Sequence, residues 1–121
     1  MAKLKSYREL QVWQKAIDLV KSVYELTEKL PSDQKYGLCG QIQRAAISIP
    51  ANIAEDYGRG HRKEYTNFLS ITNGSLAELE TFIIILQRLN YVSAEEIKTI
   101  WEMCQDIGKM LRGLSKALKE K

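Results

Sequence analysis

The segment from Gln43 to Glu55, closed by Arg59, constrains the fold more than any other part of this 121-residue chain. Its apolar residues follow helical spacing, yet Pro50 stands in its middle. At about 100° per residue, one narrow strip of this helix is polar, and most of the remaining circumference is small or apolar. The strip consists of Arg44, Ser48, Asn52, Glu55 and Arg59. Such a helix needs cover from several neighbours, so we expect it to be central in a bundle or shared between subunits.

Length and composition predict one globular domain over residues 1–121. Hydrophobic residues make up 45% and charged residues 27%, values that exclude disordered and collagen-like classes. The longest apolar run, residues 82–86, is far too short to cross a membrane. The first five residues contain no apolar signal core, so we expect a cytoplasmic protein.

The first helix is expected from about Tyr7 to Lys29, after a capping box formed by Ser6 and Glu9. It carries two adjacent apolar stripes, which together are wider than one antiparallel partner can cover. The first, expected to be a seam of the bundle core, is Leu10, Trp13, Ile17, Val20, Tyr24 and Thr27. The second is Val12, Ala16, Leu19, Val23, Leu26 and Leu30.

Three further helices are predicted. The second runs from about Tyr36 to Gly58 and is kinked at Pro50, at a cost of roughly 3 kcal/mol. The third runs from about Arg62 to Asn90, where Gly74 and Ser75 indicate a close helix crossing. Its core face is Phe68, Thr72, Leu76, Leu79, Ile83 and Leu86.

The last helix follows a second capping box, Ser93 to Glu96, and has the clearest seam in the chain. That seam is Ile97, Ile100, Cys104, Ile107, Leu111, Leu114 and Leu118. No segment alternates with the period of a strand. The sequence therefore predicts an all-α fold, an antiparallel up-down-up-down four-helix bundle with short connections.

Catalytic and metal-binding residues are scarce, so we expect no enzyme activity, no cofactor and no metal site. His61 is the one histidine, and a di-iron bundle would need Glu-x-x-His pairs. Cys39 and Cys104 are too few for a zinc site and lie on apolar stripes, which indicates reduced, inert core thiols.

Two basic clusters are the candidate nucleic-acid-binding residues. Arg59, Arg62 and Lys63 surround the turn between the second and third helices, flanked by Tyr57 and Tyr65. The last helix contributes Lys109, Arg112, Lys116 and Lys119. Since the second and fourth helices of such a bundle end at one pole, both clusters should meet there and could neutralise phosphates. The alternatives are an ordinary solvated turn and cations that complement a helix dipole.

The polar strip on the second helix has its own alternatives. Arg44, Asn52 and Glu55 could form an ion-pair network with Glu78 or Glu64 of the third helix. Such a network would fix register and subunit orientation. The competing interpretation is a polar pocket that holds a ligand.

Several motifs resemble those of the four-helix proteins encoded in intervening sequences of bacterial large-subunit ribosomal RNA genes, over about residues 7–115. They are Trp13 with Lys15-Ala16, Tyr36-Gly37-Leu38, Gln41-Ile42-x-Arg44-Ala45-Ala46-x-Ser48-Ile49-Pro50-x-Asn52-Ile53-Ala54-Glu55, Glu64-x-x-x-Phe68-Leu69, Gly74-Ser75-Leu76-x-Glu78-Leu79-Glu80 and Leu89-x-Tyr91.

The resemblance implies a four-helix bundle similar to the accessory protein of diversity-generating retroelements. That relative forms a pentameric barrel with a basic surface and acts on a reverse transcriptase and RNA. Two departures from the family pattern, Asp56 in place of glycine and Asn73 in place of a basic residue, lower the local positive potential.

We therefore expect a non-enzymatic homo-oligomer, with a pentamer favoured by the resemblance, that binds structured RNA through its basic end. The alternative is a module that docks a protein partner, such as a reverse transcriptase, without contacting nucleic acid. The assembly is expected because the apolar surface exceeds what one subunit can bury.

Overall fold

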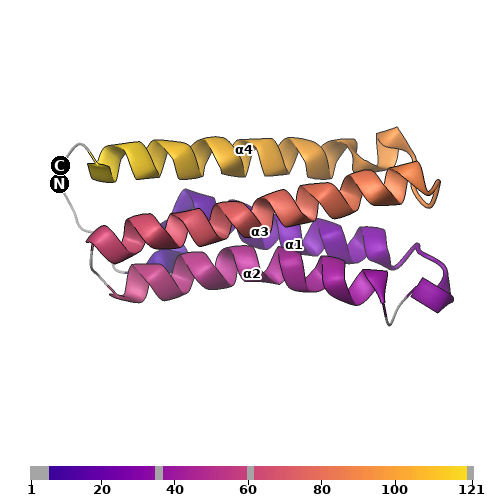
Figure 1. Ribbon diagram of the computed structural model, residues 1–121, viewed down its shortest axis with the longest axis horizontal. Coiled ribbons are helices and arrows are strands. Elements are labelled where there is room, and N and C mark those ends of the chain that lie inside the picture. The colour runs from indigo at the N-terminus through magenta and orange to yellow at the C-terminus, as the bar shows by residue number, and fades with distance from the viewer. Residues whose placement is uncertain (1–5, 35–36, 60–61, 120–121) are drawn as a thin grey trace.

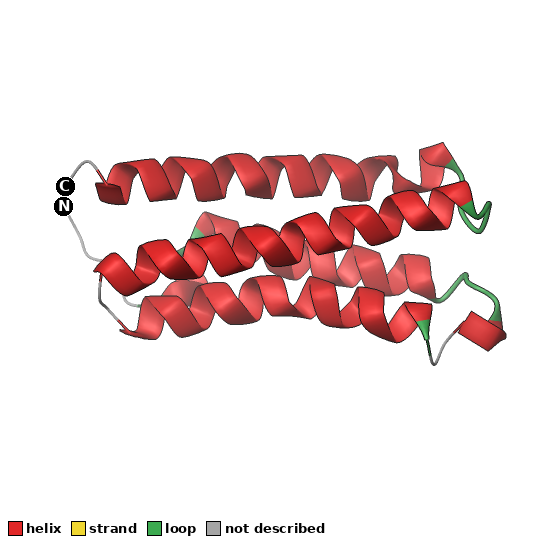
Figure 2. Ribbon diagram, viewed as in Figure 1, coloured by secondary structure: helices red, strands yellow, loops and turns green. Residues whose placement is uncertain are grey.

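The computed structural model describes residues 6–34, 37–59 and 62–119. They form four long α-helices, α1 (Gln11–Thr27), α2 (Leu38–Arg59), α3 (Arg62–Arg88) and α4 (Ala94–Lys119). Two short 3-10 helices, η1 (Tyr7–Glu9) and η2 (Ser32–Gln34), precede α1 and α2. The long helices lie side by side, and the described residues contain no strand (Figures 1 and 2). The prediction of an all-helical protein with four helices is confirmed.

Each long helix packs against two others. The packed pairs within the described part are α1 with α2, α2 with α3, α3 with α4, and α1 with α4. The helices therefore occupy the corners of a four-sided bundle, and side chains from all four meet in one core.

The start of α1 differs from the prediction. The Ser6 hydroxyl accepts a hydrogen bond from the backbone N–H of Arg8 at 3.1 Å and caps η1 instead of a long helix. Leu10 then takes an extended conformation with φ −72° and ψ 125°, so α1 begins only at Gln11. An extended residue interrupts the i→i−4 hydrogen bonds of a helix. Leu10 therefore separates the predicted capping box from α1, the helix that the box was expected to start.

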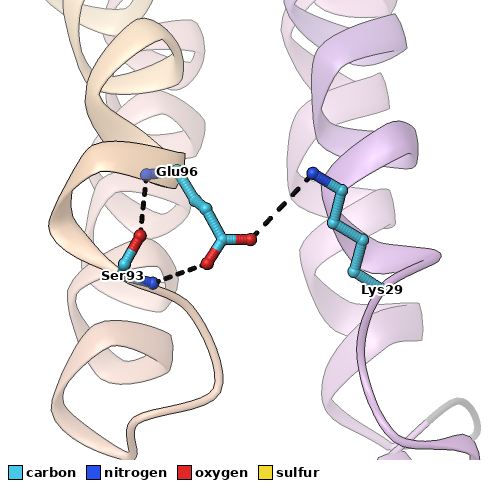
Figure 3. A network of polar contacts seen from close by, with 3 residues as sticks. All are labelled: Lys29, Ser93 and Glu96. Atoms are coloured by element: carbon cyan, nitrogen blue, oxygen red, sulfur yellow. Dashed lines mark hydrogen bonds and ion pairs between the residues drawn. The ribbon is translucent and has the colours of Figure 1, made fainter.

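The capping box at the start of α4 is confirmed (Figure 3). The Ser93 hydroxyl accepts the backbone N–H of Glu96 at 3.1 Å, and the Glu96 carboxylate accepts the backbone N–H of Ser93 at 3.0 Å. Lys29, just beyond the end of α1, lies 4.0 Å from the other carboxylate oxygen. The backbone hydrogen bond from Ser93 is the main cause that lowers the pKa of Glu96, and the Ser93 hydroxyl and Lys29 act in the same direction.

This lowered pKa predicts a pH-dependent stability. The Glu96 carboxylate stabilises the folded state above its ordinary pKa near 4.5, and the stabilisation is lost as the pH falls through the lowered folded-state pKa. We expect Glu96→Gln to unfold at lower urea concentration than wild type at about pH 7, with the difference shrinking as the pH falls below 4.5 and through the lowered pKa of Glu96. Glu95→Gln is the matched control, because Glu95 is exposed and adjacent but not part of the box. A difference that persists unchanged in acid would contradict the assignment.

The end of α3 is closed by a Schellman motif. Asn90 has a φ of 63°, a left-handed conformation that asparagine tolerates better than most residues. The backbone N–H of Tyr91 reaches the carbonyl of Leu86 at 3.1 Å, and that of Asn90 reaches Gln87 at 3.0 Å. The motif ends α3 two residues before the predicted boundary and turns the chain toward α4.

The core confirms most of the predicted helix faces. On α3 and α4 the described members of both predicted faces are buried, apart from the half-buried Leu114, and the side chains of Phe68 and Leu118 lie outside the described part. On α1 the structure buries the second stripe, from Val12 to Leu30. The expectation that the first stripe lines the core holds only in part. Thr27 is buried and Leu10, Trp13 and Val20 are half-buried against the core, whereas Ile17 and Tyr24 are exposed.

Pro50 is buried inside α2, which continues through it to Arg59. The Ser48 hydroxyl donates a hydrogen bond to the carbonyl of Ala45 at 2.7 Å, one turn before the proline. Pro50 has no backbone N–H to donate to the carbonyl of Ala46. The hydrogen bond from Ser48 reaches the neighbouring carbonyl, that of Ala45.

Gly74 does not mark a close crossing within the chain. It is exposed, and a Cβ built on it would have no atom within 4 Å outside its own helix backbone and chain neighbours. The expectation of a close approach fits another glycine, Gly108 of α4, where a Cβ would lie 3.5 Å from Cδ2 of Leu76 on α3.

Candidate nucleic-acid interface

The turn between α2 and α3 and the C-terminal end of α4 lie at one end of the molecule, so the backbone of the turn cluster is close to the last residues of the α4 cluster. α2 ends at Arg59, α3 begins at Arg62, and α4 ends at the same side of the bundle (Figure 1). This end is opposite the turn that joins α3 to α4. The side chains of Arg59, Arg62, Lys63 and Lys119 lie outside the described part of the chain.

The described basic side chains of α4 form an exposed row. Lys109, Arg112 and Lys116 are all exposed, and they lie on the same side of the helix as Gln105. Gln105 Nε2 donates a hydrogen bond of 2.6 Å to Glu80 of α3, which shows that this side of α4 faces the border with α3. The row therefore runs along the α3–α4 border toward the basic end.

Arg112 is positioned by the close helix contact at Gly108. A Cβ on Gly108 would lie 3.4 Å from Nη1 of Arg112, so the guanidinium group lies over this glycine. The glycine thus leaves room for the cation along the surface of α4, where it is exposed to solvent.

Charges on the α1–α4 side are balanced in pairs. Lys15 contacts Asp106 at 3.3 Å, and Lys29 contacts Glu96 at 4.0 Å. Residues 107–119 contain no acidic residue, so the row on α4 has no carboxylate within its own segment. Positive charge is therefore concentrated in the C-terminal half of α4.

Asp56 changes the electrostatic expectation for this end. Only 1% of the residue is exposed, so its carboxyl group is enclosed in the bundle and is no surface charge. Apolar periodicity gives no signal for a buried acid at this position.

Tyr57 packs against the hydrophobic core, in accordance with the structural alternative to base stacking. The side chain of Tyr65 lies outside the described part. Of the two tyrosines proposed to stack on bases, the described one is thus partly used in core packing.

The polar strip of α2 is mostly on the surface. Arg44 and Glu55 are exposed, Ser48 and Asn52 are half-buried, and Glu78 of α3 is exposed. Ion pairs between described residues include neither Arg44 nor Glu78. The described part of the strip therefore lies mainly at the surface, and both its role in fixing register and the ligand pocket stay predictions.

The cysteines and potential metal ligands offer little chemistry. Cys39 and Cys104 are free, buried thiols, and burial, with a smaller contribution from Glu80, raises the pKa of Cys104 to about 12. No group of three or more potential metal-ligating side chains lies together in the described residues.

None of the described helices is both long and apolar enough to span a membrane.

The sequence reasoning missed an apolar groove on the α3–α4 border, far from the basic end. It has a volume of about 460 Å³ and is lined by Ile84, Gln87, Ala94, Ile97, Lys98 and Trp101. The available signal was that Trp101 falls outside the core seam of α4.

Comparisons with known proteins agree on one family. The family model described as 23S rRNA-intervening sequence protein matches residues 8–113. A crystal structure of a protein of unknown function from the S23 ribosomal protein family of Bacteroides thetaiotaomicron is similar at 28% sequence identity, with a TM-score of 0.80. The match covers 87% of this chain and 95% of that one. Among curated proteins, none matches the chain.

Proposed function

Because the chain belongs to the 23S rRNA-intervening sequence protein family, we propose that it is a non-enzymatic, cytoplasmic homo-oligomer that binds structured RNA. The observation that carries this proposal is the basic end, where the cationic C-terminal segment of α4 comes close to the turn between α2 and α3. A surface of this kind recognises phosphates with little dependence on base sequence.

The bundle is a single domain with antiparallel, up-down-up-down topology. Two ion pairs support this topology, since Lys15 meets Asp106 and Lys29 meets Glu96, so residue numbers rise along α1 while they fall along α4. In that topology the C-terminal ends of α2 and α4 share one pole, and each copy in an assembly adds its basic end to one surface.

The RNA proposal is tested by titrating the wild-type protein into a fluorescently labelled, structured RNA at several salt concentrations. Affinity should fall by roughly one log unit per log unit of salt for each phosphate neutralised. Absence of binding at low salt would overturn the proposal and favour the second candidate, a module that docks a protein partner such as a reverse transcriptase.

Assembly is tested by light scattering coupled to size exclusion. The apolar residues exposed on a single chain support association. A pentamer is the size that the sequence resemblance to the retroelement accessory protein would imply. A monomer at micromolar concentration would overturn this part of the proposal.

Pro50 is predicted to kink α2 in a way that the assembly requires. Pro50→Ala restores a backbone donor and improves helix propensity, yet we expect the straightened helix to shift the protein toward smaller species in light scattering. Ala51→Ser, an exposed change in the neighbouring residue, is the control. A higher melting temperature with an unchanged oligomer would show that the kink has no such role.

A further inference from the structure

The groove on the α3–α4 border has the volume and the lining of a small-molecule site. Its volume of about 460 Å³ falls within the range of about 300–1,000 Å³ that is typical of ligand pockets. Most of its lining residues are apolar, and the other two, Gln87 and Lys98, can donate hydrogen bonds. An apolar lining with a few polar groups is the usual composition of a site that binds and orients a small ligand.

Ile84 of α3 and Trp101 of α4 form the apolar walls of the groove. Each lies one helical turn from the hydrogen bond between Glu80 and Gln105, in the direction of the turn that joins the two helices. Ile84 is 41% exposed and Trp101 is 36% exposed, whereas Ile97 is only 6% exposed and lies at the bottom of the groove. An aromatic or alkyl group placed here would stack on the indole ring and cover apolar surface that is otherwise in contact with water.

Gln87 and Lys98 provide two hydrogen-bond donors further along the groove. Each lies about one helical turn beyond the apolar walls, again toward the turn that joins α3 to α4. Hydrogen bonds and ion pairs between described residues include neither side chain. Both donors are therefore available to a bound molecule.

The orientation of Lys98 is informative because two acidic residues stand at pairing distance along its own helix. Glu95 is three residues before it and Glu102 is four residues after it, spacings at which ion pairs form on a helix. Lys98 pairs with neither of them in the described structure and lines the groove instead. Its ammonium group is thus placed to meet an anion bound in the groove.

The charges of the lining residues select the kind of anion. Lys98 is the one cation among them, and none of them is acidic. One ammonium and one amide match the two oxygens and the single negative charge of a carboxylate. A doubly charged phosphate would leave one of its charges without a partner among these lining residues.

We propose that the α3–α4 groove binds a small monocarboxylate with an apolar body. Lys98 and the amide of Gln87 hold the carboxylate, and Trp101 and Ile84 hold the apolar body. From Ala94 to Trp101 the groove follows α4 for about 10 Å, which suits a single aromatic ring with a short alkyl chain better than a long acyl chain. The site is separate from the proposed RNA contact, because the groove lies away from the basic end.

Trp101 reports on binding directly. The chain has two tryptophans, so Trp13→Phe leaves Trp101 as the one source of tryptophan fluorescence. Titration of this variant with phenylbutanoate should change the emission of Trp101 to saturation, with a Kd of about 1 mM or lower. Phenylbutanol, which has the same body without the charge, should bind about threefold to tenfold more weakly.

Three further substitutions in the same background locate the site. Lys98→Gln should weaken phenylbutanoate about threefold to tenfold and leave the affinity for phenylbutanol unchanged. Lys21→Gln removes the same charge from an exposed position on α1 and is the matched control, which should keep the full affinity. Ile84→Glu places a negative charge in the wall of the groove and should abolish binding. The substituted residues are exposed, so circular dichroism should show an unchanged fold.

Each outcome either supports the proposal or overturns it. An emission change that does not saturate, or no change at about ten times the expected Kd, overturns it. Equal affinity of the Lys98→Gln variant and its parent for phenylbutanoate excludes the carboxylate contact, and unchanged binding by Ile84→Glu excludes the groove. Acrylamide quenching without ligand tests whether the groove is open: if Trp101 is shielded, protein covers the groove and the proposal fails.

Discussion

Replacing Arg59, Arg62 and Lys63 together by glutamine is expected to weaken binding of structured RNA by about 100- to 1,000-fold near 0.1 M salt. Each phosphate contact releases a counterion, so each lost contact removes about a factor of ten at that ionic strength. The salt dependence should flatten by up to about three log units of affinity per log unit of salt. Binding by fluorescence anisotropy across a salt series measures both quantities.

The matched control removes the same charge elsewhere. Replacing Lys15, Lys21 and Lys29 by glutamine also changes the net charge from +3 to 0, but on α1 and just beyond its end. Because Lys15 and Lys29 are already paired with carboxylates at the surface, this variant should keep most of the affinity and the slope. Equal losses in both triple variants would mean that only net charge matters. An unchanged slope in the Arg59, Arg62 and Lys63 variant would exclude the turn as the contact surface.

The second large effect concerns stability. Leu79 is 0% exposed near the middle of α3 and belongs to the common core. Leu79→Ala is expected to lower the free energy of unfolding by roughly 2–5 kcal/mol, because it removes buried methyl groups and leaves a cavity that the helices fill only partly. Urea denaturation at a fixed protomer concentration measures the loss, since association makes apparent stability depend on concentration.

Ile84→Ala on the same helix provides the comparison. Ile84 is 41% exposed, and alanine has the better helix propensity, so its substitution should change stability by less than about 1 kcal/mol. If both substitutions cost the same, the side chain of Ile84 must be covered in solution, which would point to a contact at the α3–α4 groove.

Several features of this structure follow directly from the sequence. The spacing of Ile97, Cys104 and Leu111 identified the buried face of α4, because a helix with one apolar stripe can bury that stripe only. The capping box at Ser93 identified where α4 begins, since its hydrogen bonds are local. The order of the helices along the chain is enough to predict that the C-terminal ends of α2 and α4, with their basic residues, lie at the same end of the bundle.

Other features could not be predicted from the sequence, because they depend on contacts in the folded chain. At Ser6 the same local motif caps only a 3-10 turn, because Leu10 leaves the helical conformation before α1 begins. Gly74 indicated a close approach, but sequence cannot say whether the approaching atoms belong to the same chain. The burial of Asp56 likewise depends on what surrounds it and leaves no mark in the apolar periodicity.

The two apolar stripes of α1 show most clearly what the sequence determines and what the tertiary structure decides. Sequence alone determined that this helix is apolar over two adjacent stripes, because helical spacing fixes which residues share a side. Only the tertiary structure decided that the stripe with Ala16 and Leu19 enters the core. The small side chain of Ala16 lets the other helices approach, whereas Trp13 and Tyr24 carry polar atoms on large rings and remain at the edge, partly in contact with water. Spacing is a property of one helix, but the choice between two stripes is made by the packing of all four helices together.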